Sequence, residues 1–64
     1  MKGLKAMRTK AKLTQAELAF MLGVKQTTVA MWETDASYPR AELLPTIAKA
    51  LNCTIDELYA EQTA

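Results

Sequence analysis

Histidine is missing from this chain of 64 residues, and cysteine occurs only once, at Cys53. Without histidine the chain lacks the commonest general base of enzymes and the commonest protein ligand of transition metals. A single cysteine cannot close an internal disulfide, and it cannot build a zinc site without histidine partners. We therefore expect no metal and no cofactor, and we expect Cys53 to behave as a small apolar residue in a reducing compartment.

Glycine and proline are also scarce, with two of each, which argues against disorder and against an all-β meander. No uninterrupted apolar run approaches the ~18 residues that a membrane span needs. The basic N-terminus lacks the apolar core and the cleavage site of a signal peptide. These absences predict a single soluble, cytoplasmic domain over residues 1–64, with no membrane contact.

The short length argues against most enzymes. A compact chain of this size has a radius of gyration of roughly 11 Å. Little volume remains for an enclosed substrate pocket, which usually needs ~300 Å³ or more. The sequence offers no site of paired carboxylates, and Gly3 and Gly23 do not form a nucleotide-binding pattern. We predict no enzymatic activity.

Positive charge is concentrated in the first part of the chain, although the formal net charge is only +1. Residues 1–25 carry six lysines or arginines and one acid, whereas residues 26–64 carry two basic residues and six acids. A basic segment favours a surface that faces a polyanion, and the alternative is an ordinary solvated lysine helix. Lys2 and Lys5 fit that alternative.

Helical spacing recurs along the chain, and no alternating run predicts a strand. An apolar stripe surrounded by lysines predicts a first helix over residues 2–11. Thr14 and Glu17 have the spacing of a capping box, which predicts that a second helix begins there. Gly23 tolerates the left-handed conformation of a helix end, so the second helix should stop at it.

The second half of the chain repeats these signals. Residues 34–39 have the composition of a turn. Apolar spacing predicts a helix that ends at Asn52, and the Thr54 and Glu57 pair is a second capping box that starts a short last helix. Pro45 leaves two alternatives for the preceding helix: it begins near Ala41 with a kink, or it begins near Leu44.

The segment that begins at Gln15 has small, glycine and apolar residues at the spacing that a pair of packed helices requires. Counted from Gln15, the fifth residue is small, the ninth is glycine, and the fifteenth and eighteenth are apolar. A small residue lets two helices approach, the glycine makes the tight turn between them, and the apolar residues fill the angle. This pattern predicts a rigid helix-turn-helix over about residues 15–34, with these structural positions: Ala19, Gly23, Val29 and Trp32.

Four segments in order, MRTKAKLTQAELAFMLGV, KQTTVAMWE, PRAELLPTIAKAL and NCTIDEL, give the chain a wider resemblance. Over roughly residues 3–60 it resembles the phage Cro/C1-repressor type of helix-turn-helix domain. The resemblance implies a compact, all-α, five-helix fold of the lambda-repressor-like kind. It also implies sequence-specific binding of double-stranded DNA by a small phage or bacterial transcriptional regulator, most often a repressor. Such domains usually bind a pseudo-palindromic operator as homodimers.

Matching positions imply where the DNA lies. The recognition helix would span about residues 26–33, in the major groove. Gln26 would pair with adenine, and Lys25 would contact a phosphate or a guanine. The whole set of residues implied at the DNA is Gln15, Lys25, Gln26, Thr27, Thr28, Ala30, Met31, Tyr38 and Arg40.

Several of these residues have more specific implied roles. Gln15 would touch a phosphate and brace the neighbouring recognition residue. Ala30 and Met31 would face a thymine methyl group, although Met31 also fits a simple exposed helix position. Tyr38 and Arg40 would lie against phosphates. Thr28 is expected to be half-buried between helices. A separate pair, Arg8 and Glu33, would form a structural salt bridge.

The sequence departs from the family pattern on the second helix. Phe20 and Met21 stand where polar residues are usual. Exposed apolar neighbours can mark a partner surface, and the alternative is that they pack locally against the first helix. Together with a recognition helix whose only cation is Lys25, these two residues favour an alternative function: a protein-interaction module of the same fold, such as an antitoxin or a partner-binding regulator.

Overall fold

The computed structural model describes residues 1–60, and in this range the chain is helical with no strand. This confirms the predicted all-α fold of five α-helices. The radius of gyration is 10.4 Å. Within the described range no helix is long and apolar enough to cross a membrane. The elements are α1 (Leu4–Lys10), α2 (Gln15–Leu22), α3 (Gln26–Glu33), the 3₁₀ turn η1 (Ala41–Leu43), α4 (Leu44–Ala50) and α5 (Ile55–Tyr59).

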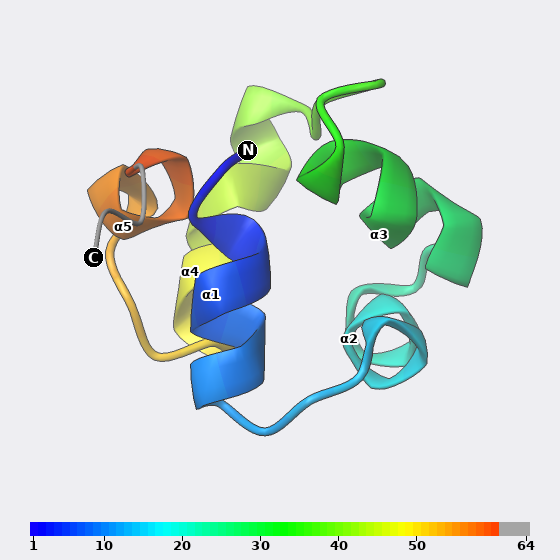
Figure 1. Cartoon of the computed structure of the whole chain (residues 1–64), viewed down its shortest axis with the longest axis horizontal. Coiled ribbons are helices and arrows are strands. Elements are labelled where there is room, and N and C mark those ends of the chain that lie inside the picture. Colours follow the sequence, from blue (N-terminus) through cyan, green and yellow to red (C-terminus); the bar gives the residue numbers. More distant parts are fainter. Residues whose placement is uncertain (61–64) are drawn as a thin grey trace.

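Figure 1 shows α2 and α3 on one side of the molecule and α5 on the other, with α1 and α4 between them. The core lies where these helices meet. Trp32 is only 3% exposed, and Cys53 packs against the edge of the core. Burial raises the pKa of the Cys53 thiol, and nearby Glu57 raises it further. The buried apolar residues come from every α-helix and from the N-terminus: Met1, Leu4, Leu18, Ala19, Val29, Trp32, Ile47, Ala48, Leu51 and Leu58.

Both predicted capping boxes are present. At α2 the Glu17 N–H donates to Thr14 Oγ1 at 3.0 Å, and the Thr14 N–H donates to Glu17 Oε1 at 2.8 Å. At α5 the matching distances between Glu57 and Thr54 are 3.1 Å and 2.9 Å. Each box satisfies backbone donors that the first turn of a helix leaves without partners.

The other helix boundaries follow local chemistry. Gly23 closes α2 with a φ of +71°, in the left-handed region that glycine adopts without strain. Pro45 is the second residue of α4, where its missing N–H costs no helical hydrogen bond. The alternative in which the helix begins at Leu44 is therefore correct, and a 3₁₀ turn precedes it. The predicted bounds were slightly wide, because α1 begins at Leu4 and α4 ends at Ala50.

The N-terminal residues pack against distant parts of the chain, which the sequence did not predict. Met1 is buried, and its ammonium group donates to the Trp32 carbonyl at 2.9 Å and pairs with the Asp35 carboxylate. The Gly3 N–H donates to the Leu58 carbonyl at 2.9 Å. A Cβ on Gly3 would lie 1.9 Å from the Glu57 carbonyl oxygen, so only glycine lets α1 and α5 approach this closely.

Candidate nucleic-acid interface

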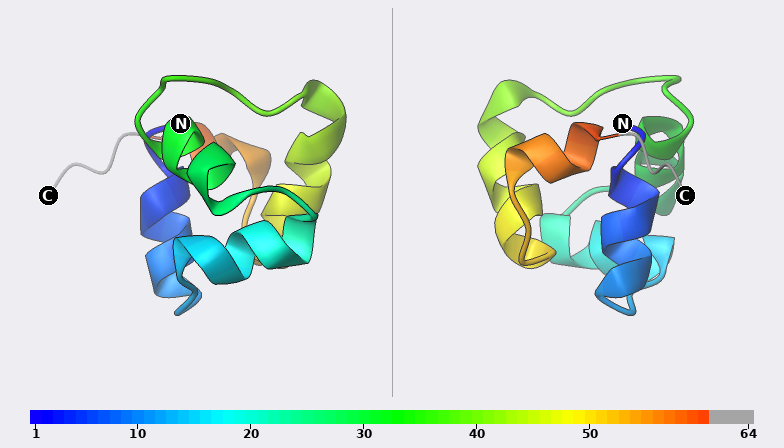
Figure 2. Two further views of the ribbon diagram at one scale, coloured as in Figure 1. Left: turned by 90° about the vertical axis from the view of Figure 1, so that its right-hand side faces the viewer. Right: turned by 60° about the vertical axis from the view of Figure 1, so that its left-hand side comes forward.

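The start of α3 is presented to solvent by a short, well-defined turn. Only Val24 and Lys25 separate the left-handed Gly23 from the first residue of α3. The side chains of Lys25, Gln26 and Thr27 are all exposed. Figure 2 shows α3 at the surface, with α2 running beneath it and the loop after α3 above it. The arrangement is that of two packed helices with the second one protruding.

A chain of hydrogen bonds links three helices behind this surface. Arg8 Nε donates to Glu33 Oε2 at 2.6 Å, and both side chains are largely buried, at 12% and 6% exposed. Glu33 Oε1 in turn accepts from Gln15 Nε2 at 2.9 Å. Gln15 Oε1 accepts from Gln26 Nε2 at 2.6 Å. The exposed amide of Gln26 is therefore oriented through Gln15 by a buried ion pair; we call these four residues the polar relay.

The polar relay leaves Gln26 able to bind a ligand. A carboxamide nitrogen carries two N–H donors and its oxygen accepts up to two hydrogen bonds. One donor of Gln26 reaches Gln15. The second donor and the oxygen are the pair of groups that recognise adenine in the major groove. Bracing the amide before a ligand arrives reduces the conformational entropy that binding must remove.

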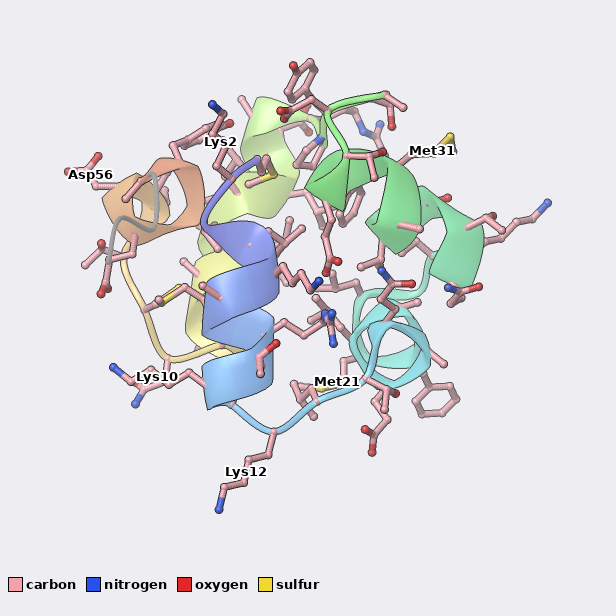
Figure 3. All side chains as sticks on the ribbon, viewed as in Figure 1. Lys2, Lys10, Lys12, Met21, Met31 and Asp56 are labelled. Atoms are coloured by element: carbon pink, nitrogen blue, oxygen red, sulfur yellow. The ribbon has the colours of Figure 1, made fainter. Side chains whose placement is uncertain are left out.

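Farther along α3 the predicted contact residues are less accessible. Thr28 and Ala30 are half-buried, beside the fully buried Val29. Met31 is 41% exposed, and its side chain points away from the molecule in Figure 3. The outward face of α3 therefore carries a polar start and a small apolar continuation. Lys25 is its only cation.

The loop after α3 holds the two remaining predicted contacts. It folds back on the helix end, where the Ala36 N–H donates to the Met31 carbonyl at 2.9 Å and Asp35 has a φ of +63°. Tyr38 is 62% exposed. Arg40 is also exposed and precedes η1 without a side-chain capping bond. The structure thus brings Gln15 and Gln26 into contact and places Tyr38 and Arg40 on a separate segment.

The apolar pair on α2 lies at the surface. Phe20 is 88% exposed and Met21 is 52% exposed. The alternative in which Phe20 packs against the first helix is therefore wrong. With Leu13, Ala16 and Glu17 the pair lines an open depression of about 400 Å³.

A larger groove lies between the end of α1 and the start of α2, and sequence reasoning did not identify it. Its volume is about 650 Å³. The only sequence signal for it was the excess of lysine and arginine before residue 26. We call this surface the α1–α2 groove, and its polar lining is Arg8, Thr9, Lys12, Thr14, Gln15 and Gln26.

Residues 1–60 hold no cluster of three or more Cys, Asp or Glu suited to a metal ion.

Known proteins are similar to this chain in sequence. A family model described as Helix-turn-helix matches residues 4–58. The HTH-type transcriptional activator BcrR of Enterococcus faecalis is 44% identical over 57 residues, which are 89% of this chain and 28% of BcrR. Repressor protein C2 of Salmonella phage P22 is 38% identical over 55 residues, which are 86% of this chain and 26% of C2. The chain spans about a quarter of the length of these two relatives.

A solved structure matches over most of its length. It is the P22 c2 repressor protein in complex with synthetic operator 9T in the presence of Tl⁺. The sequence identity is 37%, the TM-score is 0.79, and the match covers 91% of each chain. The five-helix arrangement described above is therefore shared with a protein that was solved on an operator.

Proposed function

This chain belongs to the helix-turn-helix family, in its Cro/C1 type, and from that premise we propose that it binds double-stranded DNA sequence-specifically as a small transcriptional repressor. Residues 26–33 form the recognition helix in the major groove, and two copies of the domain bind a pseudo-palindromic operator. Occupation of an operator alone can block transcription, so repression needs no further activity from the chain. No catalytic step is part of this function.

The observation that carries the proposal is the polar relay. It fixes an exposed carboxamide at the first residue of α3, where the recognition helix of such domains contacts base edges. The Arg8–Glu33 pair links α1 to α3, and its extension through Gln15 reaches the exposed amide of Gln26. With Gln26 pre-oriented, an adenine presenting N6 and N7 completes its hydrogen bonds.

The remaining predicted contacts divide by their chemistry. Thr27, Thr28, Ala30 and Met31 offer methyl groups and a hydroxyl, which suit thymine and other base edges. Lys25 approaches a phosphate or a guanine. Phosphate contacts on either side of α3 fall to Gln15 at the start of α2 and to the loop residues Tyr38 and Arg40.

Selection of binding sites from a random pool of duplex DNA tests this function directly. We expect enrichment of an inverted repeat whose half-sites lie about one helical turn, ~34 Å, apart. Enrichment of a single half-site would support sequence reading and contradict the homodimer. No enrichment even at low salt would contradict sequence-specific DNA binding.

A second candidate function is favoured by the exposure of Phe20, which is 88%. In that case the depression at Phe20 and Met21 binds a protein partner, with or without DNA on α3. Phe20→Ser should then abolish co-purification with that partner and leave DNA selection unchanged. If Phe20→Ser changes neither co-purification nor DNA selection, Phe20 is only an exposed side chain and this second function is wrong.

A further inference from the structure

The polar relay has a direction, because its innermost acceptor is a carboxylate. A carboxylate has acceptor oxygens and no donor. Glu33 Oε2 accepts from Arg8 Nε at 2.6 Å, and Glu33 Oε1 accepts from Gln15 Nε2 at 2.9 Å. The side chain of Glu33 is only 6% exposed, so water has little access to it. Glu33 therefore presents a fixed acceptor to the amide of Gln15.

This acceptor determines which way the two amides of the relay point. A carboxamide has a donor group on one side and an acceptor oxygen on the other. Because the NH₂ group of Gln15 faces Glu33, the oxygen of Gln15 faces Gln26, and Gln26 Nε2 donates to it at 2.6 Å. The amide of Gln26 is therefore held in one of its two orientations, with its nitrogen towards Gln15 and its oxygen on the other side.

The orientation of an exposed amide matters for the distinction between adenine and guanine. Both bases present the acceptor N7 in the major groove, but beside it adenine has the N6 donor and guanine has the O6 acceptor. An amide with its oxygen opposite N6 and an N–H opposite N7 fits adenine. The reversed amide opposes both of these groups, whereas it can still donate to O6 of guanine. Reversal of the Gln26 amide would therefore change which base is preferred.

We propose that Glu33 is a positioning residue that determines the base preference of Gln26, because it sets the orientation of two amides in series. This inference rests on the proposed DNA-binding function. Gln26 is the first residue of α3 and Glu33 is the last, so the two act from opposite ends of one helix. The connection between them runs through Gln15, the first residue of α2. Glu33 thus acts on the DNA sequence through the relay, with no DNA contact of its own.

Glu33→Gln is the variant that should reverse the relay. It keeps the size of the side chain and replaces one acceptor oxygen by a donor group. The guanidinium of Arg8 has only donors, so the oxygen of the new amide faces Arg8 and its NH₂ group faces Gln15. Gln15 must then turn its oxygen inwards and its NH₂ group towards Gln26. The oxygen of Gln26 accepts this bond, and its NH₂ group takes the outer side.

The readout is the ratio of affinities for adenine and guanine at one position of a selected site. The position is the one whose preference is relaxed by Gln26→Ala, and each affinity is measured by gel-shift titration. For the wild-type chain we expect adenine to be preferred by roughly 5- to 100-fold, as for one bidentate contact. For Glu33→Gln we expect this ratio to fall below about 2 or to favour guanine, because the reversed amide opposes adenine.

Two control variants separate the orientation of the amides from the packing of the helices. Arg8→Lys perturbs the same ion pair but keeps the carboxylate, so the preference for adenine should remain. Gln15→Leu disconnects Gln26 from Glu33 and leaves the ion pair in place. The amide of Gln26 can then turn over, so the preference for adenine should narrow without passing to guanine. Urea denaturation checks that each variant is folded at the assay temperature.

The outcomes distinguish a failure of the inference from a failure of its premise. If folded Glu33→Gln keeps the wild-type preference for adenine, the inference is wrong although the wild-type chain still reads DNA. An equal change for Glu33→Gln and Arg8→Lys also overturns it, because loosened packing then explains both. If Glu33→Gln does not fold, an unchanged preference in Gln15→Leu overturns the inference. If the wild-type chain selects no sequence, the proposed function fails and the inference fails with it.

Discussion

The helices α2 and α5 begin with the same device and differ in what surrounds them. Each starts with a Thr-x-x-Glu capping box of nearly equal hydrogen-bond lengths. At α2 the residue after the threonine is Gln15, which bonds to Glu33 and Gln26. At α5 the same position is Ile55, an apolar side chain that is 37% exposed. The start of α2 lies in a network of polar side chains, and the start of α5 has an apolar residue at the same position.

The support of the two helices differs in the same way. The α2 region depends on side chains, because the buried Arg8–Glu33 pair links α1 to α3 and reaches α2 through Gln15. The α5 region depends on backbone, because Gly3 lets α1 approach and the Leu58 carbonyl accepts its N–H. A capping sequence therefore determines where a helix starts, and its neighbours determine what that start is used for.

Breaking the ion pair should have the largest effect. Arg8→Met leaves the largely buried Glu33 carboxylate without its cation, with only the hydrogen bond from Gln15, so we expect a loss of about 3–5 kcal/mol in the free energy of unfolding. The double variant Arg8→Met/Glu33→Leu removes both charges and should recover part of that loss. Urea denaturation measures both. Equal stabilities of the single and double variants would show that the pair is not buried as described.

Gly3→Ala tests the backbone contact on the other side of the molecule. The new Cβ would lie 1.9 Å from the Glu57 carbonyl oxygen, so α1 and α5 must move apart. We expect a cost of about 1–3 kcal/mol, as for other overpacked sites. Gly23→Ala is the matched control, because its Cβ meets nothing within 4 Å and its cost comes from a φ of +71° alone. Thermal unfolding measures the cost of each variant, and amide hydrogen exchange in α5 should become faster only for Gly3→Ala.

Gln26→Ala tests whether the α2–α3 surface serves DNA binding more than stability. The substitution lies on the exposed surface and should leave the unfolding free energy nearly unchanged. Binding to the selected operator should weaken by about 1–3 kcal/mol, with relaxed preference at one base position. Gel-shift titration on the operator and on a set of single-base variants measures this. An equal loss on all duplexes would contradict a base contact.

The sequence predicted the parts of this fold that depend on neighbours in the chain. Capping boxes, the glycine at the end of α2 and the apolar stripes are local signals, and each helix was found within about two residues of its predicted place. The start of α4 stayed undecided, because one proline is compatible with both a kink and a first turn. The contact of Gln15 with Gln26 was expected only through the resemblance to a family.

Other features depend on distant residues and left no local signal. The closeness of Gly3 to α5 joins positions more than fifty residues apart, and the burial of Met1 against Trp32 spans 31 positions. Lys12 and Lys10 look alike in the sequence, and only the path of the α1–α2 loop turns one of them towards the groove. Such distinctions come from packing and not from composition.

The two capping boxes should contribute equally to stability. Thr14→Ala and Thr54→Ala each remove one acceptor from a first turn, so we expect each to cost about 1 kcal/mol. DNA binding should distinguish them, because Thr14 directly precedes the proposed phosphate contact Gln15, whereas Thr54 precedes α5. With both variants folded under the assay conditions, we expect Thr14→Ala to weaken binding to duplex DNA and Thr54→Ala to leave it unchanged. Equal binding by both variants would remove Thr14 from the interface.

The smallest expected effect is a pH dependence that belongs to α5. The hydrogen bond from the Thr54 backbone lowers the pKa of Glu57 below its ordinary value of 4.5, and Lys10 lowers it further. A carboxyl whose pKa is lower in the folded state stabilises the fold above its unfolded pKa, and this contribution is lost as the pH falls. Glu57→Gln keeps the hydrogen bonds of the box and removes the charge. Its unfolding free energy should therefore fall less steeply below about pH 4.5 than that of the wild-type chain, whereas parallel profiles would show that the Glu57 charge does not contribute.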